Sequence, residues 1–211
     1  MTQQTLAAQF AALHAQRERD WSPEQLAKNV GTRADLVRRY DAHAHVQVGD
    51  TVEDFTLIGE DGEAIGRDQL LARGPAVLIF YRFGGCPACN IALPHYDRHL
   101  SSVLREAGIP LVAISPQTPV DATLRARQGL SLQLAADPQG TLADRLGIAF
   151  ETDTGAIPGV ERPALPQPTI LILGPDARVR FVAASPDWLD RPEADVVLAA
   201  LPEVARVRAA A

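Results

Sequence analysis

The chain has 211 residues, of which 46% are hydrophobic and 5% aromatic, and its formal net charge is −6. This length suits one domain with additions, and the apolar fraction is enough to bury a sizeable core. The negative charge argues against nucleic acid as the main partner, because phosphate binding needs a basic face. No apolar run approaches the roughly 20 residues of a membrane span. The N-terminal stretch also lacks the apolar core of a secretory signal.

The chain contains two cysteines, Cys86 and Cys89. Two cysteines in a chain of this length do not form a disulfide scaffold. The simplest expectation is a reactive pair in a reducing, cytoplasmic compartment. We expect no cofactor and no metal.

The first 45 residues form an N-terminal arm that we expect to be helical. Leu6, Phe10 and Leu13 recur at the spacing of one helix face, which predicts an amphipathic helix over residues 2–20 with residues 17–20 facing outward. An isolated apolar stripe must be covered by something. The arm is therefore expected either to pack against the core or to make a partner contact, such as a homodimer.

A second helix begins at Ser22, because Ser22, Pro23 and Gln25 match the preferences for the N-cap, N1 and N3 positions. Gly31-Thr32 is expected to end it, and Thr32 is expected to cap a third helix to about Tyr40. His43-Ala44-His45 then ends the arm. Further metal ligands are absent from the nearby sequence, so a metal site is not expected there.

Residues 46–211 are expected to form one domain in which strands and helices alternate. A hairpin over residues 54–66 comes first, residues 150–168 are expected to be loop, and Pro168 leads into a buried strand. The other strands are predicted at 76–81, 111–115, 132–136, 169–173 and 179–183, and the helices at 68–71, 87–107, 120–128, 141–146 and 192–208. This order predicts an α/β fold, a mixed central sheet with helices on both faces.

The stretch that carries chemistry is Cys86-Pro87-Ala88-Cys89, which follows a buried strand and the pair Gly84-Gly85. A Cys at a helix N-terminus lies where backbone N–H groups and the helix dipole favour a thiolate, the reactive form. Cys86 is therefore the expected nucleophile. Cys89 lies one turn further and is expected to resolve Cys86 by forming an intramolecular disulfide. Arg82 is expected to add positive charge beside the thiolate.

Two other interpretations of the cysteine pair are weaker. Zinc binding by the pair with His95 and His99 is disfavoured, since a continuous helix carries these histidines too far along its axis. Both histidines are expected at the surface. Two unreactive buried cysteines are disfavoured because Gly84, Gly85 and Pro87 predict an exposed turn.

Four features resemble one family. They are the Cys-Pro-Ala-Cys motif with Pro94 beyond it, the segments 48–50 and 54–57, Phe80-Tyr81-Arg82 before the glycines, and Pro168-Thr169 before a strand and hairpin. Over residues 46–205 the chain is similar to the peroxiredoxin-like (AhpC/TSA) family of the thioredoxin fold. The resemblance implies a thioredoxin-like fold with the arm as an N-terminal extension.

The resemblance also implies site residues and partners. Pro168 is expected as a cis-proline with Thr169 on the substrate side of the site, next to Phe83 and Gly85. Phe83 stands where the family typically has Thr or Ser, and Gly85 stands where thioredoxin has Trp. A second active-site arginine is expected, with candidates at Arg125, Arg127 and Arg162. The reductant is expected to be thioredoxin-like or glutathione-like.

Three functions remain open from the sequence. The first is a dithiol peroxidase, in which Cys86 reduces a peroxide and Cys89 resolves it. The second is a general thiol–disulfide oxidoreductase acting on protein or small-molecule disulfides. The third is a non-enzymatic redox-sensing module that a partner reads through the arm.

Overall fold

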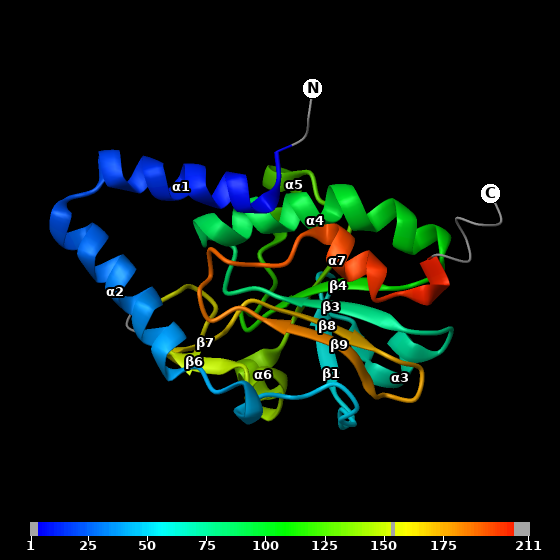
Figure 1. The fold of residues 1–211 in the computed structure, drawn as a ribbon. Helices are drawn as coiled ribbons and strands as arrows, with labels where there is room; N and C mark the ends of the chain where they lie inside the picture. Colours follow the sequence, from blue (N-terminus) through cyan, green and yellow to red (C-terminus); the bar gives the residue numbers. More distant parts are fainter. Residues whose placement is uncertain (1–3, 153–154, 205–211) are drawn as a thin grey trace.

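A seven-stranded mixed sheet forms the centre of the molecule in a computed structural model that describes residues 4–152 and 155–204 (Figure 1). The strand order is β2-β1-β5-β4-β3-β8-β9. The strands are β1 (Thr56–Gly59), β2 (Ala64–Gly66), β3 (Ala76–Phe80), β4 (Leu111–Ser115), β5 (Gln133–Ala136), β8 (Thr169–Leu173) and β9 (Val179–Ala184). The predicted mixed sheet is therefore confirmed.

The centre of the sheet is parallel and its edges are antiparallel. β3 pairs with β4 and β4 with β5 in parallel, while β8 runs antiparallel to both β3 and β9. Every residue of β3, β4 and β8 is buried, because helices cover both faces of these strands. Alternate residues of β3 face opposite sides: Val77 and Ile79 join one core cluster, and Leu78 and Phe80 join the other.

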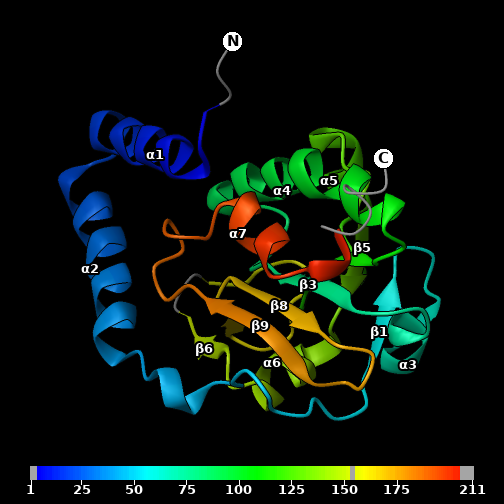
Figure 2. The ribbon, with the colours of Figure 1, turned by 45° about the vertical axis from the view of Figure 1, so that its right-hand side comes forward.

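The helices form layers on the two faces of this sheet (Figures 1 and 2). The first core cluster contains residues of α4 (Pro87–Glu106), α5 (Ala122–Gln128) and α7 (Ala194–Ala199). The second contains residues of α3 (Arg67–Leu71) and α6 (Thr141–Arg145). The fold class of the prediction, with helices on both faces, holds.

Three boundaries differ from the prediction. α2 runs unbroken from Pro23 to Arg39, and Thr32 donates its hydroxyl to the Lys28 carbonyl instead of capping a new helix. Residues 150–168 are not all loop, since β6 (Ala149–Glu151) and β7 (Ala164–Pro166) form a small separate sheet. α7 ends at Ala199, and residues 205–208 of the predicted C-terminal helix lie outside the described part of the chain.

The arm packs against the core, as one of the two interpretations predicted. α1 (Leu6–Asp20) lies along α4, and Leu6 and Phe10 are fully buried there. Ser22 forms the expected capping box at the start of α2 with Gln25. One expectation is wrong: Arg17 does not face outward, because only 5% of it is exposed.

A short segment after β9, residues 185–193, attaches the arm to the domain. The Arg33 guanidinium of α2 donates two hydrogen bonds of 2.7 Å to the Asp187 carboxylate. The Glu193 carboxylate accepts the backbone N–H groups of Leu6 and Ala7, both at 3.0 Å, at the start of α1. A carboxylate is favourable there, since the first N–H groups of a helix lack partners within it.

The histidines take structural positions. His95 is buried and lies 3.4 Å from the Glu193 carboxylate, so the expectation of a surface residue is wrong for it. His45 is buried too, and its ring stacks on Tyr40. The described residues contain no group of three potential metal ligands and no helix long and apolar enough to cross a membrane.

The Arg33–Asp187 pair generates a prediction about how the arm is held. Asp187→Asn leaves a half-buried guanidinium with a weaker partner, so we expect the free energy of unfolding to fall by about 1–3 kcal/mol. Hydrogen exchange within α2 should accelerate. The matched control is Asp35→Asn, whose pair with Arg38 is exposed and should contribute little. Equal effects of the two variants would contradict this view.

The same pair predicts a pH dependence. Burial alone would raise the pKa of Asp187, but its hydrogen bonds from Arg33 outweigh burial and lower the pKa below the ordinary value. The stabilisation is therefore present above the unfolded pKa and is lost as the pH falls through the folded pKa. In melting curves recorded from neutral to acid pH, the stabilities of the unaltered protein and of Asp187→Asn should become more similar as the pH falls. Asp187→Asn should lose less stability on acidification than the unaltered protein.

Candidate active site

The site begins where β3 ends and α4 starts. Cys86 is the N-cap of α4, and its Sγ accepts the backbone N–H of Cys89 at 3.4 Å. Pro87 occupies the first helical position, where its missing N–H costs nothing. The local sequence thus places both sulfur atoms in the first turn of the helix.

Two glycines allow the loop before Cys86 to close. A Cβ on Gly84 would lie 2.4 Å from the Asp121 carboxylate, and a Cβ on Gly85 would lie 3.2 Å from the Phe83 ring. The Gly84 amide donates to the Gln117 side chain at 3.0 Å. Packing around the loop therefore explains why small residues stand at both positions.

The two thiols are more buried than the sequence suggested. Gly85 and Pro87 are exposed, as expected of a turn, but only 2% of Cys86 and none of Cys89 is exposed. Both cysteines are free thiols, and they hydrogen-bond to each other. The pair is consequently a buried dithiol, in which Cys86 is slightly more exposed than Cys89.

Arg191 is a candidate site residue that the sequence did not reveal. It is buried in segment 185–193, and its Nη2 lies 3.6 Å from Cys89 Sγ. Its Nε donates to the Trp188 carbonyl at 3.2 Å, and its guanidinium stacks over the Phe10 ring at 5.5 Å. The contact with the sulfur spans 102 residues of sequence. A sequence pattern that pairs the two positions is not evident.

The charge of the dithiol is placed differently from the prediction. The hydrogen bond to Cys89 and burial raise the pKa of Cys86 well above the ordinary value. Burial also opposes ionisation of Cys89, but the hydrogen bond from Cys86 and the charge of Arg191 outweigh it and lower the pKa of Cys89 well below the ordinary value. The negative charge therefore settles first on Cys89, with Cys86 donating its proton toward it.

Arg82 lies where the sequence placed it, beside the thiols. Its guanidinium carbon stands 4.3 Å from the Trp188 ring centre and 5.7 Å from that of Phe150. Its charge acts to lower the pKa of Cys86, although this effect is smaller than those of burial and of Cys89. Phe83, half-buried, lies 5.9 Å from the same guanidinium.

Pro168 and Thr169 lie behind the site rather than on its open side. Among the described residues the cis peptide bond is Thr118–Pro119, so the expected cis bond at Pro168 is wrong and the bond is trans. Pro168 shares a small buried gap with Tyr96 and Arg191. Thr169 is buried and donates its hydroxyl to the Gln167 carbonyl at 2.9 Å.

None of the three arginine candidates contacts a cysteine within the described residues. Arg125 is bound by Glu60 and two backbone carbonyls, and Arg162 pairs with Asp144. Arg127 comes nearest the loop, with a hydrogen bond of 3.3 Å to the Gly84 carbonyl. The arginine at the sulfur atoms is Arg191 instead.

A cavity of about 390 Å³ opens onto Cys86. It lies between the arm and the thiol-bearing turn. Its lining is shared by α1, α2, the turn and segment 185–193, and includes Arg17, Trp21, Lys28, Arg82, Cys86 and Trp188. Cys89 does not line it. Cys86 is thus the sulfur that an incoming molecule meets first.

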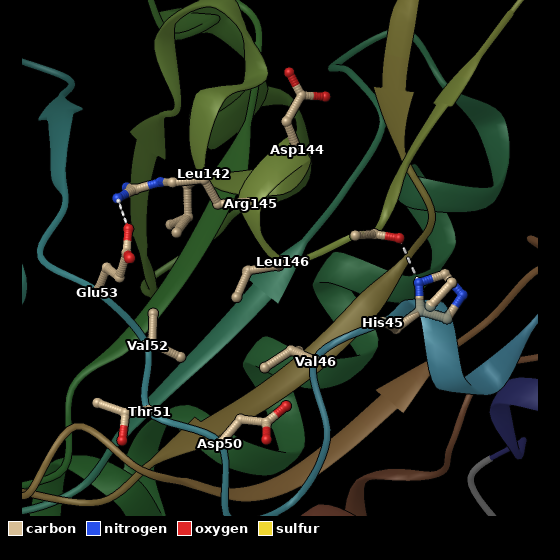
Figure 3. A pocket seen from close by; sticks show the side chains of 12 residues that line it. His45, Val46, Asp50, Thr51, Val52, Glu53, Leu142, Asp144, Arg145 and Leu146 are labelled. Atoms are coloured by element: carbon tan, nitrogen blue, oxygen red, sulfur yellow. Dashed lines mark hydrogen bonds and ion pairs between the residues drawn. The ribbon is translucent and has the colours of Figure 1, made fainter.

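A second cavity, of about 620 Å³, lies elsewhere, between residues 44–53 and α6 (Figure 3). Figure 3 shows Arg145 reaching the Glu53 carboxylate and His45 turned to a backbone carbonyl. The cavity is lined by neither cysteine. Thiol chemistry therefore belongs to the smaller cavity.

Comparison with known proteins identifies the fold and the family. The sequence profile of the AhpC/TSA family matches residues 48–182. Among curated proteins, no sequence relative matches the chain. Among solved structures, peroxidoxin BcpB from Mycobacterium tuberculosis is 26% identical with a TM-score of 0.59, and the match covers 78% of this chain and 98% of that one.

Two further structures are similar in fold. AhpC from Enterococcus faecalis is 15% identical over 77% of this chain and 95% of its own, with a TM-score of 0.61. A putative protein disulfide isomerase from Bacteroides thetaiotaomicron is 17% identical over 77% of this chain and 89% of its own, with a TM-score of 0.54. The fold is therefore thioredoxin-like, and the profile match spans more than half of the chain. The chain belongs to the AhpC/TSA family.

Proposed function

We propose that the protein is a dithiol peroxidase in which Cys86 attacks the peroxide and Cys89 resolves it. The observation that carries this proposal is the difference in position between the two sulfur atoms. Cys86 lines the cavity, whereas Cys89 lies one turn deeper beside Arg191. The first is placed to meet a substrate, and the second is placed to meet Cys86.

In the proposed reaction the peroxide oxidises the cysteine pair by two electrons, and an external thiol then reduces the pair by two electrons. Cys86 sulfur attacks the terminal peroxide oxygen, an S–O bond forms as the O–O bond breaks, and the leaving oxygen takes a proton from solvent water to become an alcohol or water. Cys86 is now a sulfenic acid. Cys89 sulfur then attacks Cys86 sulfur, the S–O bond breaks, and water leaves as the disulfide forms. An external thioredoxin-like or glutathione-like thiol reduces the disulfide by exchange and is itself oxidised.

The buried pair supplies the first proton transfer. In the resting dithiol, Arg191 stabilises negative charge on Cys89, and Cys86 holds a proton directed at that charge. As Cys86 attacks, this proton passes to Cys89, so that Cys89 acts first as base and then as resolving thiol. Arg82 contributes positive charge on the Cys86 side during the attack.

Phe83 favours a second candidate function, the reduction of disulfides. The residue three positions before Cys86 has no hydroxyl to orient a peroxide, and its ring lines the cavity instead. In this reaction Cys86 attacks a disulfide sulfur, a thiolate leaves, and Cys89 releases the mixed disulfide. A non-enzymatic redox sensor is the third candidate. For each of these three candidate functions we also propose that the protein is cytoplasmic and that it forms a homodimer through the arm. We propose as well that the chain divides at residue 45 into the arm and the domain.

Cysteine variants test the peroxidase directly. Cys86→Ser should reduce peroxide consumption to the background rate, because the sulfur that meets the substrate is gone. Cys89→Ser should consume peroxide in a single turnover and accumulate a sulfenic acid, which dimedone labelling and mass spectrometry detect at Cys86. Accumulation of the label at Cys89 in Cys86→Ser, with continued turnover, would reverse the two roles.

The disulfide reductase is distinguished by its substrate. Insulin reduction with a dithiol donor, measured beside peroxide consumption in the same preparation, separates the two activities. Negligible peroxide turnover with rapid insulin reduction would refute the peroxidase. An absent Cys86–Cys89 disulfide in digests of the mildly oxidised protein would refute every dithiol function.

Arg191 generates a pH prediction. Its positive charge lowers the pKa of Cys89, so replacing it raises that pKa and moves the ionisation of the pair to higher pH. Arg191→Gln should shift the midpoint of iodoacetamide alkylation to higher pH. Arg191→Lys should restore much of the midpoint because it keeps the charge. Arg180→Gln removes a remote, half-exposed arginine and should change nothing. An unchanged midpoint in Arg191→Gln would show that the guanidinium only packs.

A further inference from the structure

The arm gives the cavity over Cys86 a cationic wall. Arg17 comes from α1, Lys28 from α2 and Arg82 from the turn before α4, and all three line the cavity. No Asp or Glu is among the described residues that line it. The family profile covers residues 48–182, so Arg17 and Lys28 lie outside the part of the chain that it describes.

Arg17 contributes a guanidinium to this wall and has no carboxylate partner among the described residues. Its residue exposure is 5%, yet its hydrogen bond is a weak one of 3.4 Å to the Asn29 amide oxygen. Its guanidinium also stacks over Trp21, with 4.9 Å to the ring centre. None of the carboxylates in the described residues pairs with it. A guanidinium presents five N–H donors, and a buried one is normally paired with an acid.

The Arg17 guanidinium lies close enough to the Cys86 sulfur for the two groups to interact electrostatically. Burial lowers the pKa of Arg17, and the negative charge that Cys86 carries when its proton has passed to Cys89 acts in the opposite direction. Arg17 and Cys86 also line one cavity. A molecule bound to the guanidinium would therefore extend toward the thiol.

The remaining walls suit an apolar body. Trp21, Trp188 and Phe83 all line the cavity together with Cys86. A volume of about 390 Å³ falls within the usual range for small-molecule sites. The lining therefore offers apolar and cationic contacts to a molecule larger than hydrogen peroxide.

We propose that this cavity binds a carboxylate-bearing organic hydroperoxide, with Arg17 holding the carboxylate and aromatic walls holding the apolar body over Cys86. Arg17 is a specificity-determining residue that the arm adds to the family's site. That the bound molecule carries a hydroperoxide group rests on the proposed peroxidase function. Recognition of its carboxylate does not depend on that function, and carboxylate binding can be measured without turnover.

Binding is measured by intrinsic fluorescence with a non-oxidisable ligand. Both tryptophans of the chain, Trp21 and Trp188, line the cavity, so a bound molecule should perturb the whole tryptophan signal. The ligand is 4-isopropylbenzoate, and its uncharged counterpart is 4-isopropylbenzamide. We expect saturable binding of the carboxylate and affinity at least tenfold weaker for the amide. Equal affinities, or preference for the amide, would overturn the proposal.

Three variants assign the anion to Arg17. Arg17→Gln should weaken carboxylate binding by about 10- to 100-fold, the range expected for losing a charge-assisted hydrogen bond. Arg17→Lys should recover part of the affinity. Arg19→Gln, an exposed arginine on the same helix, should bind like the unaltered protein. Equal losses in Arg17→Gln and Arg19→Gln would refute a specific site. If Arg17→Gln fails to fold, the carboxylate-to-amide ratio of the unaltered protein decides.

Turnover then separates this proposal from the function on which it builds. The substrates are 4-carboxycumyl hydroperoxide and its methyl ester, with hydrogen peroxide as the reference. Preference for the carboxylate substrate, lost in Arg17→Gln, supports both proposals. Carboxylate binding without turnover of any peroxide supports the carboxylate site at Arg17 and refutes the peroxidase function. Turnover of hydrogen peroxide and of both organic substrates at equal efficiency refutes the site and leaves the peroxidase.

Discussion

The contact between Arg191 and Cys89 is the interaction on which the site depends. A buried dithiol is inert unless something stabilises its first negative charge, because burial by itself raises the pKa of both thiols. Arg191 supplies a positive charge next to Cys89, on the side away from the cavity. The hydrogen bond from Cys86 and the charge of Arg191 together lower the pKa of Cys89, while Cys86 lines the cavity.

Local patterns in the sequence predicted most of the fold. The apolar runs of β3, β4 and β8 are buried strands, and the Ser22 capping box begins α2. Tertiary packing overrode weaker local signals. Gly31 did not stop α2, which stays helical through it, and prolines did not prevent β6 and β7 from pairing. Helix and strand ends depend on such contacts, which a single sequence does not display.

The site was predicted in part, for a similar reason. Cys86, Cys89 and Arg82 come from one short stretch, so spacing alone brought them together. Arg191 contacts Cys89 and Arg17 lines the cavity over Cys86, so they approach the thiol pair from opposite ends of the chain. Both are buried, contrary to what their residue type suggests. An arginine on a helix of mixed polarity is ordinarily an exposed residue. Its function becomes visible only once its neighbours in space are known.

Segment 185–193 has a consequence for cooperativity. Within nine residues it pairs with α2 through Asp187, stacks on Arg82 through Trp188, reaches Cys89 through Arg191 and caps α1 through Glu193. The arm and the thiol pair therefore belong to a single folding unit, and neither can open without disturbing the other. Insertions or deletions within this segment would break the register of these four contacts, so they should be tolerated far less here than in exposed surface turns.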